Sequence, residues 1–130
     1  MYPHAAFVTL LAVLVLGFAG ALVGRARGRF GIHAPATSGH PDFERVFRAQ
    51  MNTLEQTVAF LPTLWLAALF FDPMYAAWAG YAWVAARVWY VLAYARDAKA
   101  RGPAFLVGSL ALLAVLAMAL WGVGKALLAG

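Results

Sequence analysis

The sequence predicts an all-α integral membrane protein, a four-transmembrane-helix bundle in which residues 1–130 form one domain. The chain has 130 residues, of which 65% are hydrophobic and only 12% charged, and its mean hydropathy is +0.77. Soluble domains are about half apolar and about a quarter charged, so these polar side chains are too few to cover a water-facing surface. The apolar residues also form runs of about 20, the length that crosses a bilayer.

Four helices are expected, at about residues 5–25, 43–71, 74–98 and 103–128. The first and last contain the uncharged stretches Ala5–Gly24 and Gly102–Gly124. The two middle helices extend apolar segments into more polar sequence, and a tight turn at Asp72-Pro73 separates them. The segment 28–42 is rich in Gly and Pro, so it is predicted to be the one irregular loop.

Positive charge is concentrated in two of the expected connections. The first basic connection and the adjoining helix start carry Arg25, Arg27, Arg29, Arg45 and Arg48; the second carries Arg96, Lys99 and Arg101. Connections rich in Lys and Arg stay on the cytoplasmic side of a membrane. We therefore expect both termini outside and both basic connections inside. The net charge of +5 is read as this orientation signal, and no nucleic-acid partner is expected.

The second helix carries a polar stripe. Arg48, Asn52 and Glu55 follow one another at i, i+4 and i+7, so they share a helix face, and Arg45 continues that stripe outward while Gln50 points elsewhere. A charge at the bilayer centre costs about 2.5–3.5 kcal/mol on insertion scales, so these charged side chains must have a partner that offsets this cost. The stripe is either an Arg–Glu pair that holds the bundle together or a pocket for a zwitterionic ligand.

A second polar set follows on the third helix. Arg87, Tyr90, Tyr94 and Arg101 stand at offsets 0, 3, 7 and 14, one face if the helix continues that far. Snorkelling arginines with interfacial tyrosines would explain such a pattern without a ligand, but Arg87 lies deep inside the helix. The chain has no cysteine and only 3 scattered histidines, so no metal site is expected.

The run from Phe43 to Glu55 resembles the signature of the MAPEG family (membrane-associated proteins in eicosanoid and glutathione metabolism), roughly F-E-R-x-x-R-A-x-x-N-x-x-E on the second helix. The segment around Leu64–Ala67 and the segment Ala86–Tyr90, with Tyr94, are similar to the microsomal glutathione transferase 2 and leukotriene C4 synthase branch of that family. The resemblance covers most of the chain.

This resemblance implies a homotrimer in a lipid membrane, with glutathione as cosubstrate bound between subunits near the cytoplasmic side. Position by position, it implies that glutathione contacts Arg48, Gln50, Asn52, Glu55, Arg87, Tyr90 and Tyr94, with Arg27 and Arg29 as further loop contacts. Arg101 matches the catalytic arginine that faces the glutathione sulfur. A free thiol has a pKa near about 8.5, and a nearby guanidinium lowers it, which favours the reactive thiolate.

The implied activity is that of a glutathione S-transferase, with peroxidase activity as an addition, acting on hydrophobic electrophiles or lipid hydroperoxides. Gln56 stands where the leukotriene branch has a tyrosine, and Gly28 where it has an arginine. These differences favour a bacterial-type detoxification enzyme of the inner membrane over leukotriene synthesis. Two alternatives from other classes are a non-enzymatic lipid-binding scaffold of the same fold and a small four-helix exporter.

Overall fold

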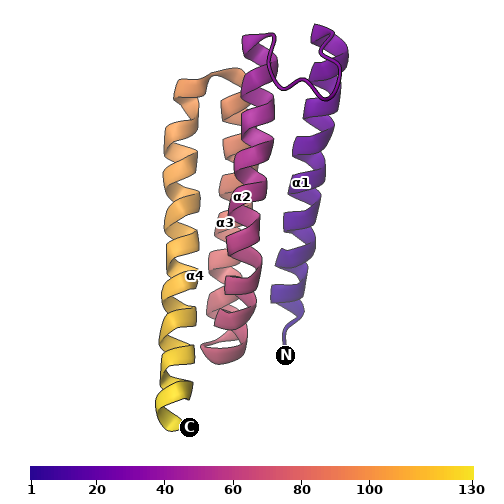
Figure 1. The fold of residues 1–130 in the computed structure, drawn as a ribbon. Helices are drawn as coiled ribbons and strands as arrows, with labels where there is room; N and C mark the ends of the chain where they lie inside the picture. Colours follow the sequence, from indigo (N-terminus) through magenta and orange to yellow (C-terminus); the bar gives the residue numbers. More distant parts are fainter.

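The computed structural model describes residues 1–130 as four long helices and one short turn of 3₁₀-helix. The helices are α1 (Pro3–Phe30), α2 (Pro41–Phe70), α3 (Pro73–Arg96) and α4 (Arg101–Ala129), and the 3₁₀ turn Ala98–Ala100 precedes α4. They run up and down side by side, so that both termini and the α2–α3 turn lie at one end of the bundle (Figure 1). The long α1–α2 loop and the α3–α4 connection lie at the other end. The all-helical prediction is confirmed.

The helix ends differ from the predicted ones at two places that matter for the site. α1 continues to Phe30, so its three arginines lie on its last turns rather than in a connection. It ends at Gly31, whose φ of 66° is a left-handed conformation that glycine adopts without steric cost. α3 ends at Arg96 because Asp97 is extended, and α4 begins at Arg101. The third helix therefore does not continue as far as Arg101, which was the condition for one helix face to carry all four residues.

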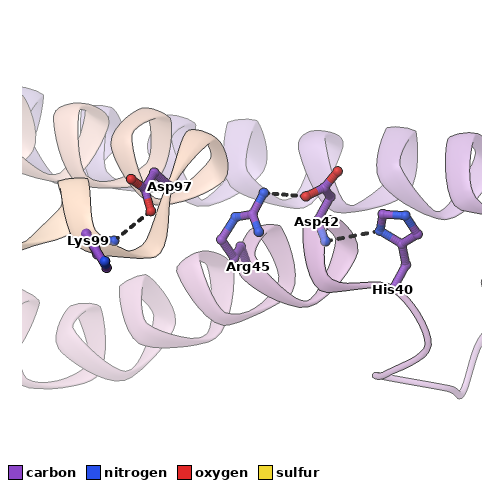
Figure 2. A network of polar contacts seen from close by, with 5 residues as sticks. All are labelled: His40, Asp42, Arg45, Asp97 and Lys99. Carbon is purple, nitrogen blue, oxygen red and sulfur yellow. Dashed lines mark hydrogen bonds and ion pairs between the residues drawn. The ribbon is translucent and has the colours of Figure 1, made fainter.

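The middle helices begin where the sequence places an acceptor side chain before a proline. Asp72 Oδ1 accepts hydrogen bonds from the backbone N–H groups of Met74 and Tyr75 at 2.8 and 2.9 Å, which confirms the predicted turn. His40 Nδ1 accepts from the N–H of Asp42 at 3.1 Å, as Figure 2 shows. Such caps satisfy backbone donors that have no partner inside the helix, and proline at the first helical position has no donor to satisfy.

Three segments are long and apolar enough to cross a membrane: α1, α2 and Ala98–Ala129. The prediction of four spans is thus supported directly for three of them. α3 has 24 residues but is not among the three, because its apolar residues are interspersed with Trp and Tyr and because it carries Arg87. It packs against α1, α2 and α4, so it occupies the centre of the bundle rather than its edge.

Small side chains form the buried faces of α1 and α4, and large apolar side chains of these two helices point outward. The buried stripe of α1 consists of Ala5, Val8, Ala12, Val15, Ala19, Val23 and Ala26. The corresponding stripe of α4 consists of Ala104, Gly108, Ala111, Val115, Ala119 and Gly122. In contrast, Leu10, Leu14 and Leu110 are exposed. Small residues at helix contacts let helices approach closely where lipid, not water, is the solvent.

Gly122 is the position where this close approach is tightest. A Cβ atom there would stand 2.3 Å from the carbonyl oxygen of Phe70, whereas a Cβ at Gly124, two residues further along α4, would meet nothing within 4 Å. We predict that Gly122→Ala destabilises the bundle by about 1–3 kcal/mol, the usual cost of overpacking. Gly124→Ala should be neutral or slightly stabilising, because alanine favours helix. Unfolding in mixed micelles checks both, and equal stability of the two variants would contradict the packing.

Candidate functional site

The guanidinium of Arg87 lies between α2 and α3 at the centre of the candidate site. The side chain is fully buried, with 0% of its surface exposed. Its Nη1 donates to Asn52 Oδ1 at 2.9 Å and to Thr53 Oγ1 at 3.4 Å, and the guanidinium carbon lies 4.1 Å from the ring centroid of Tyr90. Asn52 and Thr53 of α2 are therefore joined directly to the third-helix set.

Two further donors of Arg87, Nε and Nη2, are buried and have no hydrogen-bond partner. A Cβ at Gly108 of α4 would stand 3.7 Å from Nε, at van der Waals contact, so α4 packs directly beside this donor. Buried donors in proteins are almost always paired with protein or water. These two are thus available to an acceptor group, such as a carboxylate or carbonyl, that enters the site.

The tyrosines of α3 connect Arg87 to the basic end of the bundle. Tyr90 and Tyr94 pack edge to face, with their ring centroids 5.6 Å apart, and the guanidinium carbon of Arg101 lies 5.2 Å from the centroid of Tyr94. The four residues predicted to share a face are thus brought together. Arg101 reaches the tyrosines from the first residue of α4, after the chain has turned.

The stripe on α2 faces out of the bundle. Arg48 and Glu55 are both exposed, and the one ion pair of the chain joins Arg45 to Asp42. The interpretation of Arg48 and Glu55 as an ion pair that holds the bundle together is therefore wrong. Arg45, one turn before Arg48, is paired with Asp42 at the start of α2 (Figure 2).

Gln50 lies on another side of α2, as its position in the sequence predicts. A Cβ at Gly20 of α1 would stand 3.3 Å from its Nε2, so Gln50 faces α1 of its own chain. The polar side chains predicted to bind one ligand are therefore divided between two faces: Arg48 and Glu55 outward, and Gln50 toward α1. Asn52, with its bond to Arg87, lies between the helices.

The two loop arginines differ in their surroundings. Arg27 Nη1 donates to the carbonyl oxygens of Ala36 and Ile32 at 2.8 and 3.4 Å, and its guanidinium lies over the ring of Phe43, so it anchors the α1–α2 loop. Arg29 is exposed and makes no such bond. Of the two, Arg29 is free to meet a ligand without releasing the loop.

Sequence reasoning missed two contacts at this site. Thr53, which the sequence pattern did not single out, accepts from Arg87 and donates to Ala49 O at 2.8 Å. Gln56 accepts from Trp83 Nε1 at 3.0 Å. The departure from the family pattern at Gln56 thus has a structural partner on α3. No group of three or more His, Cys, Asp or Glu side chains is placed to hold a metal ion.

The fold and the site together define a class of protein. It is an all-helical membrane protein with a buried arginine beside a pair of tyrosines that pack edge to face. Residues 5–121 match the model of the MAPEG family, and the chain belongs to this family. It is 46% identical over 105 residues to an uncharacterised protein of Synechocystis, covering 81% of this chain and 77% of that protein. It is 44% identical over 117 residues to rat leukotriene C4 synthase, covering 90% of this chain and 78% of that protein. It is 43% identical over 96 residues to bovine microsomal glutathione S-transferase 2, covering 72% of this chain and 66% of that protein.

Asn52 is predicted to hold Arg87 in place. Asn52→Ala removes the oxygen that accepts from Arg87 Nη1 at 2.9 Å. We expect the free energy of unfolding to fall by about 1–3 kcal/mol, the cost of leaving a buried donor unpaired. Gln50→Ala is the control, since Gln50 makes no bond to a buried charge. Unfolding of both variants in mixed micelles, without added ligand, provides the measurement. If both unfold like the parent, Asn52 does not support Arg87.

Proposed function

We propose that the protein is a membrane-bound glutathione S-transferase, with glutathione peroxidase activity toward lipid hydroperoxides. The family and two of the relatives support a glutathione-dependent membrane function. The observation that carries the finer proposal is the convergence of Arg87 and Arg101 on the Tyr90–Tyr94 pair. This arrangement offers cations and hydroxyl groups where an anionic, thiol-bearing peptide would bind.

In this proposal different residues bind different chemical groups of glutathione. Arg48 and the free donors of Arg87 are the cations available to its two carboxylates, and Glu55 is the anion available to its ammonium group. Gln50, Asn52, Tyr90 and Tyr94 supply hydrogen bonds that orient the peptide, and Arg29 extends the contacts at the loop. Charge-assisted hydrogen bonds of this kind are shorter and stronger than neutral ones.

Arg101 is proposed to act on the sulfur. From the basic end of the site its guanidinium would stabilise the thiolate over the thiol and so lower the thiol pKa from about 8.5. The thiolate then attacks an electrophilic carbon of a hydrophobic molecule that arrives through the lipid. The nucleophile belongs to the cosubstrate, so the chain itself needs no catalytic serine or cysteine.

The outward direction of Arg48 and Glu55 supports a homotrimer with its sites between subunits. Exposed charges on a membrane helix are costly against lipid, whereas a neighbouring copy would cover them and a zwitterionic ligand would pair with them. Gln50 and Arg27, which face α1 and its loop, would then meet the ligand of the adjacent site. Head-to-tail contacts between two different surfaces of the same chain form a ring when the rotation that relates the subunits closes.

Four membrane crossings also belong to this proposal. α3 has 24 residues and is therefore about 36 Å long at 1.5 Å per residue, enough to cross a hydrocarbon core of about 30 Å. Of the ten Lys and Arg residues, all except Arg87 and Lys125 lie at the end of the bundle that carries the α1–α2 loop. That end would be cytoplasmic by the distribution of positive charge, in a bacterial inner membrane.

The role of Arg101 is tested by the ultraviolet difference spectrum of the solubilised protein with glutathione. The parent should give a thiolate band near neutral pH, and Arg101→Ala should lose it. Conjugation of a hydrophobic electrophile should fall at least about tenfold, since one pKa unit is a tenfold change in thiolate at pH values below the thiol pKa. The deficit should shrink as pH rises above about 8.5, where free thiol ionises unaided.

Lys99→Ala is the matched control for Arg101→Ala, because Lys99 is a nearby exposed cation of the same connection. It should retain the band and the rate. An Arg101→Ala variant as active as the parent at neutral pH would refute the proposed role of Arg101. Absence of both the band and glutathione binding in the parent would favour a lipid-binding scaffold of the same fold instead.

Arg48 is predicted to bind glutathione without supporting the fold. Arg48→Ala should weaken glutathione binding by at least about tenfold, because a hydrogen bond to a charged group contributes about 1.5–3 kcal/mol. Its thermal stability without glutathione should match that of the parent, since Arg48 is exposed and has no partner within the chain. Calorimetric titration in micelles measures the affinity. Unchanged affinity with a lowered melting temperature would instead assign Arg48 a structural role.

A further inference from the structure

A second polar site lies at the basic end of the bundle. It is a groove of about 420 Å³ between α1, α2 and the end of α3. Its cationic lining consists of Arg25 and Arg29 of α1, Arg45 of α2 and Arg96 of α3. Of the residues proposed to bind glutathione, Arg29 alone lines this groove, and the inference does not rest on that proposed role.

The groove has an excess of unpaired positive charge. Asp42 is its one carboxylate, and that carboxylate is already paired with Arg45. Arg25, Arg29 and Arg96 are exposed and have no acidic partner, and the Nε of Arg45 is buried without a hydrogen-bond partner. Planar guanidinium groups bind phosphate oxygens in pairs. Four of them around one cavity therefore favour an anion that carries phosphate.

The rest of the lining shows which kind of phosphate compound fits. Half of the residues around the groove are apolar, among them Leu22, Phe30 and Val46. A wholly apolar groove of about 350 Å³ follows it along the same two helices, lined on α1 by residues such as Leu14 and Phe18 and on α3 by Val84 and Val88.

The two grooves lie on one face of α1. Leu11, Leu14, Phe18, Leu22, Arg25 and Arg29 succeed one another at spacings of three or four residues, which keeps them on one side of a helix. The apolar residues of α1 lie about 10 to 20 Å from Arg25 along the axis, at about 1.5 Å per residue. One leaflet of hydrocarbon is about 15 Å thick, so an acyl chain would extend over this part of the face.

We propose that this face of α1 and α3 binds one anionic phospholipid, with the phosphate headgroup held by Arg25, Arg29, Arg45 and Arg96 and an acyl chain along the apolar groove. A soluble phosphate compound would use the arginines but leave the apolar groove empty. A zwitterionic phospholipid carries a cationic group of its own, which the arginines of the groove would repel. Basic pockets between membrane helices on the cytoplasmic side commonly bind anionic headgroups.

The test is lipid binding by the purified protein in a non-ionic detergent, followed by native mass spectrometry. The probes are dioleoylphosphatidylglycerol, dioleoylphosphatidylcholine with the same acyl chains, and inorganic phosphate as competitor. We expect one phosphatidylglycerol per chain, bound at least about tenfold more tightly than phosphatidylcholine and not displaced by an equal concentration of inorganic phosphate. Displacement by phosphate alone would mean a site for a free anion and would overturn the lipid assignment.

The variant Arg25→Gln/Arg96→Gln should bring the affinity for phosphatidylglycerol to within about twofold of that for phosphatidylcholine. Lys99→Gln/Lys125→Gln removes the same formal charge outside the groove and should bind like the parent. The groove arginines are exposed, so circular dichroism and the elution volume should not change; Arg25→Lys/Arg96→Lys, which keeps the charges, should bind with intermediate affinity. If Arg25→Gln/Arg96→Gln and Lys99→Gln/Lys125→Gln lose the same amount of affinity for phosphatidylglycerol, net charge alone explains binding and the proposal is overturned.

Discussion

The buried guanidinium of Arg87 sets the arrangement of the polar end of the bundle. In a lipid-embedded protein a cation without partners is expensive, so α2 must present Asn52 and Thr53 to it at hydrogen-bonding distance. α3 supplies the ring of Tyr90 beside it, and Gly108 of α4 lies next to its Nε. One side chain thus constrains the relative positions of three helices. Its two unpaired donors then leave a place where a ligand can replace the missing acceptors.

The surrounding fold follows from lipid acting as the solvent. Burial does not distinguish leucine from alanine when both inside and outside are apolar, so close packing decides which residues lie between helices. Alanine, glycine and valine therefore form the buried stripes of α1 and α4, and leucines such as Leu10 and Leu110 face outward. All Lys and Arg residues except Arg87 and Lys125 lie at the end of the bundle that carries the α1–α2 loop, where water and headgroups are within reach. The basic groove is at that end, whereas the residues proposed to bind glutathione extend deeper along the helices, as far as Glu55 and Arg87.

The single chain presents two kinds of incomplete surface. Arg48 and Glu55 face outward without a partner, and a neighbouring subunit with its bound ligand is proposed to complete them. The groove between α1 and α3 is open at the basic end and apolar below it, and a lipid is proposed to complete that one. The two proposed sites share Arg29, but Arg25, Arg45 and Arg96 belong to the groove alone, whereas Arg48, Arg87 and Arg101 belong to the glutathione site alone. A change in lipid binding can therefore be separated experimentally from a change in catalysis.

The sequence by itself determined the helical membrane class, the turn at Asp72-Pro73 and the basic end, because hydropathy, capping and charge are properties of short segments. It also identified the polar residues of the site and the family, since the signature on α2 is a continuous run. Only the tertiary structure decided that Arg101 reaches Tyr94 from a new helix, that Arg48 and Glu55 do not pair, and that Gln56 bonds Trp83. These contacts join residues distant in sequence or depend on where a helix stops. They are decided by how the helices cross and which way each side chain points, which no local pattern specifies.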